Sequence, residues 1–249
     1  MNSNIINPFD WEAAWRKTLA GCPRRIAITD LDGTCWDDIL VVLNEQFGPI
    51  DPGTQQKRWR TYDHAYKVAG TMTNGAHLVA EYKDLLAVKT LPELVDWAKN
   101  NIPLIPGMHD FVQLMTGAGC GIVAVSNGAR QIAEPKIAHH GLPFPLMSNW
   151  FEGDELKFVH DEHVGIDKGV LVEKAVEWGY EVVCFSGDAK GDIKGAEATA
   201  KHGGLVLACG NAGLQSWCQS NLMPEQWKPY TDFRQVVGCV ELQSRIGGN

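Results

Sequence analysis

Two aspartates one residue apart, Asp30 and Asp32, follow a short apolar run and precede Gly33 and Thr34. At the end of a buried strand, the first carboxylate of such a pair can act as a nucleophile while the second transfers protons. Gly33 lets the chain turn with backbone N–H groups facing the site, where they can hold an anion. A simple turn or a fragment of a calcium loop would also explain this motif alone, although the residue that closes such a loop is missing.

A second apolar run, residues 121–125, ends in Ser126, Asn127 and Gly128. A hydroxyl at the tip of a strand, ahead of a turn and a helix, is a good donor to a phosphate oxygen. The same serine could instead be a simple helix cap. We therefore treat these three residues as candidates for phosphate binding.

A third apolar run, residues 182–185, leads into Asp188 and, four positions later, Asp192. Lys168 lies between the second and third of these runs and precedes a helical apolar pattern. A lysine there can neutralise a transferring phosphoryl group, or it can be a solvated surface residue.

The elements that must position these residues are predicted from the alternation of strand and helix signals. Asn7 and Pro8 predict the start of a helix ahead of the first strand. We expect strands at residues 26–29, 121–125, 144–147, 182–185 and 205–208. This pattern predicts an α/β fold, a Rossmann-like parallel sheet with helices on both faces, whose strand tips share one edge.

The long segment between the first two strands carries mostly helical signals. We expect helices over residues 39–47, 55–69, 75–88 and 91–100. The predicted domains are a catalytic core, residues 1–35 and 105–249, and a helical cap, residues 36–104. A cap over the sheet edge can exclude water and select the substrate.

Within the predicted cap, Arg58 and Arg60 lie about 200° apart around a helix, so at most one can face a substrate anion. Arg58 flanks an aromatic stripe and is the candidate for this contact, unless the helix only packs and exposes a basic face. Asp37 and Asp38, just after the first motif, can read a substrate amine or hydroxyl, or can cap the next helix.

Four carboxylates, those of Asp30, Asp32, Asp188 and Asp192, are expected at one edge of the sheet. At low effective dielectric they repel one another by several kcal/mol, so the arrangement requires a cation. Oxygen ligands with open positions for water and phosphate favour Mg²⁺.

The composition limits the classes of function. The chain has 249 residues, 45% of them hydrophobic, which is enough for one core and a smaller unit. Its net charge of -8 argues against nucleic acid or a membrane surface as a partner. No apolar run approaches the ~18 residues of a membrane span, and no leader pattern is present, so we expect a cytoplasmic protein. A homodimer is compatible with the sequence. The seven cysteines include no Cys-x-x-Cys pair and are expected to be reduced.

The order of these motifs resembles the haloacid dehalogenase superfamily over about residues 24–210. The helical insert and the sequence around Lys168 are most similar to those of its phosphoserine phosphatase group. The stretch at Asp37 and the tail at residues 229–233 are also similar to methionine-salvage phosphatases.

The resemblance implies roles for the motif residues. Asp30 would form an aspartyl-phosphate and Asp32 would be the general acid/base, while Ser126 and Lys168 would hold the phosphoryl group. Asp188, with Asp30 and the backbone carbonyl of Asp32, would bind Mg²⁺, and Asp192 would support the metal indirectly. The expected substrate-binding set is Ser126, Asn127, Gly128, Thr34 and Arg58.

The sequence therefore predicts a Mg²⁺-dependent phosphatase for a small-molecule phosphate ester. A dehalogenase or phosphonatase of the superfamily would lack the second aspartate, Asp32. The alternatives are a phosphotransferase or phosphomutase with the same nucleophile, and a non-catalytic sensor of a phosphate ligand.

Overall fold

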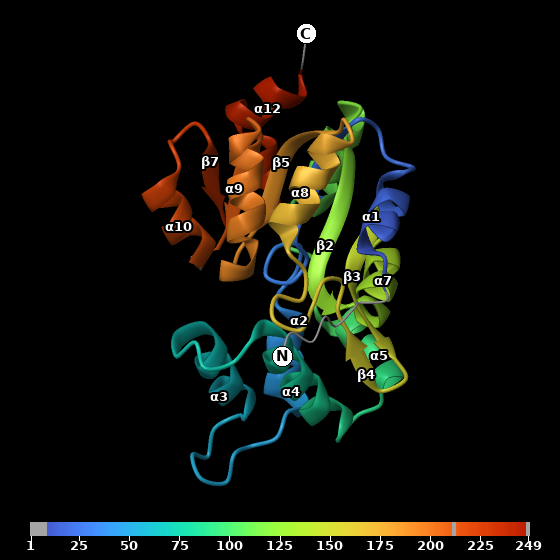
Figure 1. Ribbon diagram of the computed structural model, residues 1–249, viewed down its shortest axis with the longest axis vertical. Helices are drawn as coiled ribbons and strands as arrows, with labels where there is room; N and C mark the ends of the chain where they lie inside the picture. The colour runs from blue at the N-terminus through green and yellow to red at the C-terminus, as the bar shows by residue number, and fades with distance from the viewer. Residues whose placement is uncertain (1–8, 211–212, 248–249) are drawn as a thin grey trace, which may run out of the picture.

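The computed structural model describes residues 9–210 and 213–247, and within them the chain forms a central seven-stranded sheet (Figure 1). The strand order is β4-β3-β2-β1-β5-β6-β7, with every neighbouring pair parallel except β3 and β4. The strands are β1 Arg25–Thr29, β2 Gly121–Ala129, β3 Leu146–Glu152, β4 Glu155–Lys157, β5 Glu181–Gly187, β6 Leu205–Cys209 and β7 Trp227–Tyr230. The predicted α/β class is confirmed.

Both faces of the sheet are covered by helices, which explains why its strands are nearly continuous apolar runs. In β1, Ala27 contributes to the core on one face, and Ile26 and Ile28 contribute to the core on the other. The helices of the second face are α1 Trp11–Leu19, α8 Lys168–Glu177, α9 Ile193–Lys201 and α10 Gly213–Asn221. Those of the first face are α5 Leu91–Asn101, α6 Met108–Gly117, α7 Arg130–His139, α11 Phe233–Val237 and α12 Val240–Ile246.

Two details differ from the sequence-based expectation. Strand β7 pairs with β6 and extends the sheet, with the side chain of Tyr230 buried, so this tail strand was missed. Helix α1 is capped by Asp10, whose carboxylate accepts a hydrogen bond from the backbone N–H of Ala13. The predicted cap Asn7 lies outside the described residues.

The predicted cap segment forms helices close to the expected ones. They are α2 Ile39–Phe47, α3 Trp59–Asp63, a π-helical turn at His64–Val68, α4 Asn74–Leu86 and α5. Figure 1 shows α2, α3 and α4 beyond the ends of the strands, on the side where β1 and β2 finish. By contrast, α5 packs on α7. The domain boundaries at residues 36 and 104 stay a prediction.

Helix α4 is fixed to the core at two points. The buried hydroxyl of Tyr82 accepts a hydrogen bond from the backbone N–H of Ala129, at the end of β2. At the start of the helix, the backbone N–H of Gly75 donates to the carbonyl of Glu162, in the loop before α8. These bonds hold α4 over the edge of the sheet. None of the helices in the described residues is long and apolar enough to cross a membrane.

The contact at Gly75 gives a test of this docking. A Cβ atom at residue 75 would lie 2.1 Å from the carbonyl oxygen of Glu162, so Gly75→Ala must push α4 away from the loop. We expect a loss of roughly 1–3 kcal/mol in the free energy of unfolding, measured with urea. The matched control is Gly117→Ala, where a Cβ atom meets nothing within 4 Å. Equal midpoints for the two variants would contradict the docking.

Candidate active site

A cavity of about 140 Å³ opens at the edge where β1, β2 and β5 end. It lies between the tips of these strands, the first turn of α8 and the helices of the predicted cap. Its walls on the core side include most of the residues proposed from the sequence: Asp30, Asp32, Ser126, Asn127, Gly128, Lys168, Asp188 and Asp192.

The ammonium group of Lys168 connects two of the aspartates. Its Nζ atom lies 2.5 Å from Asp30 Oδ1 and 2.5 Å from Asp192 Oδ1, and the lysine is only 3% exposed. Burial opposes the charge on Lys168, but Asp192 and Asp30 outweigh it and hold the pKa of the ammonium above its usual value. Lys168 is therefore a fixed cation at the floor of the cavity.

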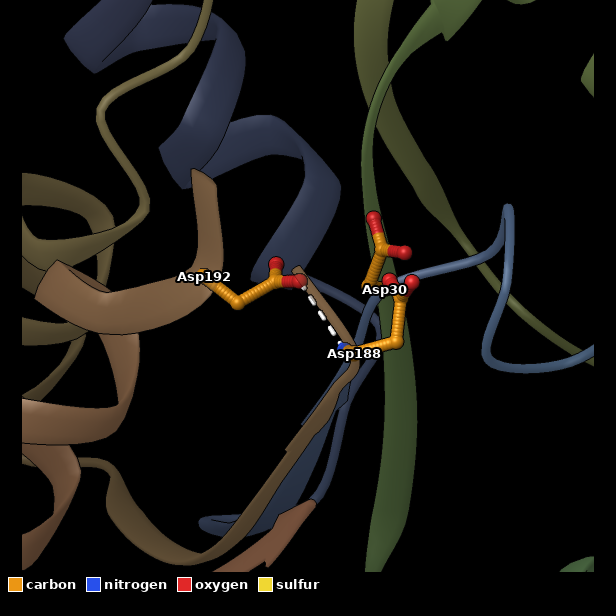
Figure 2. A group of neighbouring side chains, drawn as sticks. All are labelled: Asp30, Asp188 and Asp192. Carbon is orange, nitrogen blue, oxygen red and sulfur yellow. Dashed lines mark hydrogen bonds between the residues drawn. The ribbon is translucent and has the colours of Figure 1, made fainter. Parts of the chain in front are cut away.

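Asp192 orients the turn that carries Asp188. Its Oδ2 accepts hydrogen bonds from the backbone N–H groups of Asp188 and Ala189, both at 3.0 Å, and Figure 2 shows the first of these. Gly33 makes the close approach from β1 possible, since its φ is +80° and a Cβ atom there would lie 2.4 Å from Asp188 Oδ2. The turn after β1 and the turn after β5 are thus in contact.

The acidic side chains fit a hard divalent cation. Carboxylate oxygens of Asp30, Asp188 and Asp192 lie within 4.8 Å of one another (Figure 2). Asp188 Oδ1 is buried without a hydrogen-bond partner in the described part of the chain. Burial, and then repulsion from Asp192, raise the pKa of Asp188 to about 8. Burial also raises the pKa of Asp30 well above its usual value, although Lys168 opposes this. A cation bound by Asp30 and Asp188 would reverse these shifts, while both oxygens of Asp192 already have partners.

Asp32 lies in a different set of contacts. Its Oδ1 accepts hydrogen bonds from the indole N–H of Trp36 at 2.9 Å and the backbone N–H of Ile39, and its Oδ2 accepts one from the Ser126 hydroxyl at 3.2 Å. Burial, followed by the charge of Asp38, raises the pKa of Asp32 to about 6. A carboxyl group in this range can both donate and accept a proton near neutral pH.

Three smaller residues shape the site around Asp32 and Asp30. Gly128 is needed for close approach, because a Cβ atom there would lie 2.8 Å from Asp32 Oδ2, and its N–H donates to Ser126 Oγ. Thr34 is fully buried and does not line the cavity, and its hydroxyl donates to Asp30 Oδ2 at 3.3 Å. It therefore contacts the carboxylate of Asp30 and no part of the cavity where a substrate would bind.

Asn127 lines the cavity, and the oxygen of its side-chain amide is already used. Asn127 Oδ1 accepts a hydrogen bond from the backbone N–H of Ile166 at 2.9 Å, which fixes the loop before Lys168. Its backbone carbonyl accepts another from the side chain of Asn149. The structure thus gives Asn127 a role in positioning Lys168.

Arg58 of the predicted cap lies away from the cavity. Its guanidinium pairs with Asp84 of α4 at 2.9 Å, and it does not line the cavity. A carboxylate of α4 thus occupies this guanidinium, and the contact of Arg58 with a substrate stays a prediction. The cap residues that do line the cavity were missed as a set: Asp63, Tyr66, Lys67, Asn74, His77 and Glu81.

Trp36 was also missed, and nothing in its spacing from Asp32 marks it as a hydrogen-bond donor rather than a core residue.

Asp38 was expected either to contact the substrate or to cap the next helix. It caps α2 through the N–H of Val41 at 3.1 Å and it also lines the cavity. Asp37 is exposed and does not line the cavity.

No protein-family model matches the sequence, and a comparison with curated proteins finds no significant match. Solved structures do match. A haloacid dehalogenase family hydrolase from Salmonella enterica serovar Typhi is 14% identical, with a TM-score of 0.66 over 95% of this chain and 82% of that one. A phospho-aspartyl intermediate analogue of phosphoserine phosphatase is 19% identical, with a TM-score of 0.57 over 85% of this chain and 96% of that one.

A third match, phosphoserine phosphatase from T. onnurineus, is 15% identical, with a TM-score of 0.56 over 86% of this chain and 92% of that one. At these identities the likeness concerns the fold. The chain has the fold of haloacid dehalogenase-type hydrolases, and within that class its fold is similar to that of phosphoserine phosphatases. The fold expected from the motif order is therefore confirmed.

The buried lysine can be tested without an activity assay. Lys168→Met would leave Asp30 and Asp192 buried without their cation, and we expect it to lower the free energy of unfolding by roughly 3 kcal/mol in the presence of a chelator. The control is Lys194→Met, because Lys194 pairs with Asp167 at 2.6 Å but is largely exposed. If the urea midpoints fall equally in both variants, the buried ion pairs of Lys168 contribute no more to the free energy of unfolding than the exposed pair of Lys194.

Proposed function

We propose that this protein is a Mg²⁺-dependent phosphatase that hydrolyses a small phosphomonoester through an aspartyl-phosphate on Asp30. The single observation that carries the proposal is the contact of Asp30 with Lys168 at 2.5 Å, beside the buried and unpartnered Asp188 Oδ1. A nucleophile, a fixed cation and a free oxygen ligand thus share one small cavity. This combination suits phosphoryl transfer, in which charge on the phosphoryl oxygens must be neutralised around an in-line nucleophile.

In the first half of the reaction, a carboxylate oxygen of Asp30 attacks phosphorus as the bond to the alcohol oxygen breaks. Lys168 favours the ionised form of Asp30 and attracts the phosphoryl oxygens. Ser126 lies at the tip of β2, and its hydroxyl, which donates to Asp32 in this structure, would donate to one of these phosphoryl oxygens when the ester binds. Asp32 gives its proton to the leaving alcohol, which departs neutral.

In the second half, the ionised Asp32 takes a proton from water, and the oxygen of that water attacks phosphorus. The bond from phosphorus to Asp30 breaks, which releases inorganic phosphate and restores the free carboxylate. The hydrogen bonds from Trp36 and Ile39 keep Asp32 oriented for both transfers. A pKa of about 6 suits a group that must donate and then accept a proton.

Mg²⁺ would be held by Asp30, Asp188 and the backbone carbonyl of Asp32, with Asp192 orienting the turn, and would supply charge neutralisation at the phosphoryl oxygens. The orphaned Asp188 Oδ1 and the clustered carboxylate oxygens support this assignment. The similar structures support the same chemistry, because one of them is a phosphoserine phosphatase with an analogue of a phospho-aspartyl intermediate.

The cavity volume supports a small substrate. At about 140 Å³ it falls below the ~300 Å³ at which pockets for drug-sized ligands begin. A phosphoryl group and a short alcohol fill such a space, whereas a nucleotide requires the cap to move.

We expect Asp30→Asn to reduce phosphate release from a panel of small phosphomonoesters by roughly 10³-fold or more, because the amide cannot form the covalent intermediate. Chelation of Mg²⁺ is expected to abolish release by the unaltered protein. The control is Asp96→Asn, the same change at a largely exposed residue of α5. Wild-type turnover in Asp30→Asn would exclude this nucleophile, and transfer to an added sugar in preference to water would favour a phosphotransferase.

Asp32→Asn should slow single-turnover hydrolysis by roughly 10²- to 10⁴-fold, since the proton to and from the reacting oxygens has no carrier. Trp36→Phe keeps the buried ring but removes the indole N–H, and we expect a smaller loss of about tenfold in kcat with little change in KM. Rapid-quench measurement of both half-reactions checks the roles. If Asp32→Asn left both rates unchanged, Asp32 would not be the general acid/base.

A further inference from the structure

The half of the cavity formed by the predicted cap is acidic. Three carboxylates line it, from Asp38, Asp63 and Glu81, against one lysine, Lys67, and one imidazole, that of His77. The other two lysines of the cavity, Lys168 and Lys190, come from the sheet edge where the phosphoryl group is proposed to bind. Negative charge therefore exceeds positive charge where the alcohol portion of an ester would lie.

Two of the three cap carboxylates already face cationic or polar partners. Asp63 pairs with Lys67 at 2.7 Å, and Glu81, which is 1% exposed, faces His77 Nε2 at 2.9 Å. Asp38 differs, because it forms no ion pair within residues 9–210 and 213–247, and only its Oδ1 is used, in capping α2. The second oxygen of Asp38 is free to contact a ligand.

His77 provides an independent sign that a ligand belongs here. It is 7% exposed, it lines the cavity, and neither of its ring nitrogens makes a hydrogen bond of good geometry within the described chain. With Nε2 directed at Glu81, a neutral imidazole carries its proton on Nε2 and leaves Nδ1 as an acceptor. A buried acceptor without a donor favours a ligand that brings hydrogen-bond donors.

The local helix geometry supports a binding role for this wall. Tyr66 and Lys67 lie in the π-helical turn His64–Val68, a distortion that is frequent at functional sites. The Tyr66 ring stacks on His77, with centroids 5.1 Å apart, and also lines the cavity. An aromatic face beside carboxylates adds a further favourable contact for a cation.

We infer that the cap wall around Asp38, Glu81 and His77 is a subsite for an ammonium group, so that the substrate is the phosphate monoester of a short amino alcohol without a carboxylate. This inference rests on the proposed function and specifies its substrate. The ammonium contacts the free oxygen of Asp38 and donates to His77 Nδ1, while the phosphoryl group lies at Lys168 and the sheet edge.

The same wall disfavours a carboxylate on the substrate. Among the described residues no arginine lines the cavity, and Lys67, the cation of the cap wall, is already paired with Asp63. A substrate carboxylate would meet Asp38 and Glu81 without a counter-ion, which is costly in a partly desolvated site. The inference therefore separates this site from one built for a phosphorylated amino acid.

Three esters of similar size test the subsite: 2-aminoethyl phosphate, 2-hydroxyethyl phosphate and carboxymethyl phosphate. We expect kcat/KM for the aminoethyl ester to exceed that of the hydroxyethyl ester by about tenfold, and that of the carboxymethyl ester by more. Asp38→Asn, which keeps a side chain able to cap α2, should remove most of the preference for the ammonium ester. The control Asp96→Asn changes the net charge equally and should keep the ratio.

Calorimetric binding of the three esters to the Asp30→Asn variant with Mg²⁺ separates the subsite from the chemistry. Tighter binding of the aminoethyl ester that is lost in the Asp30→Asn, Asp38→Asn double variant supports the ammonium subsite. If the unaltered protein hydrolyses none of the esters while this binding preference holds, only the phosphatase proposal fails. Phosphate release with equal or reversed preference, or an unchanged ratio in Asp38→Asn, overturns the subsite and leaves the phosphatase proposal standing.

Discussion

The buried ammonium group of Lys168, held between Asp30 and Asp192, is the interaction on which this site depends. Isolated buried carboxylates are so costly that they take up protons, and a protonated aspartate is neither a nucleophile nor a ligand for a cation. One lysine at 2.5 Å from each carboxylate offsets part of that cost. Burial still raises the pKa of Asp30 well above its usual value and, with repulsion from Asp192, raises the pKa of Asp188 to about 8. The Mg²⁺ that we propose would offset the remaining negative charge.

The fold makes this arrangement possible because the charged residues come from distant parts of the chain but from one edge of one sheet. Strands β1, β2 and β5 bring their carboxyl ends together, and α8 begins at Lys168 on the same edge. Glycine at residues 33 and 128 then allows the turns to approach within contact distance of Asp188 and Asp32. The backbone, as much as the side chains, sets the distances on which the charge balance depends.

The sequence was most informative where a residue's place is set by local pattern. Apolar runs that end in polar residues predicted the strand tips, and so predicted that Asp30, Ser126 and Asp188 would share one cavity, whereas Lys168 was assigned to the site by the order of the motifs. The sequence was least informative where tertiary packing determines which side chains form ion pairs or hydrogen bonds with one another. The pairing of Arg58 with Asp84 depends on how α3 lies against α4, and no spacing rule brings those helices together. The hydrogen bond from Trp36 to Asp32 likewise depends on a turn whose geometry the sequence does not specify.

The two halves of the cavity differ in how their carboxylates are paired with cations. Because of this difference, the residues proposed to select the substrate are distinct from those proposed to react with it. At the sheet edge, Lys168 offsets part of the negative charge, and the proposed Mg²⁺ would bind Asp188 Oδ1, which has no hydrogen-bond partner in the described chain. At the cap wall, Asp38 has no such partner in the described chain, although its charge already raises the pKa of Asp32 after the effect of burial. A dianionic ester approaching that wall is repelled unless its other end is positive. Asp38, which caps α2 and forms no ion pair in the described chain, would therefore favour a ligand of the opposite sign, and so a carboxylate outside the reacting centre would decide which ester is bound.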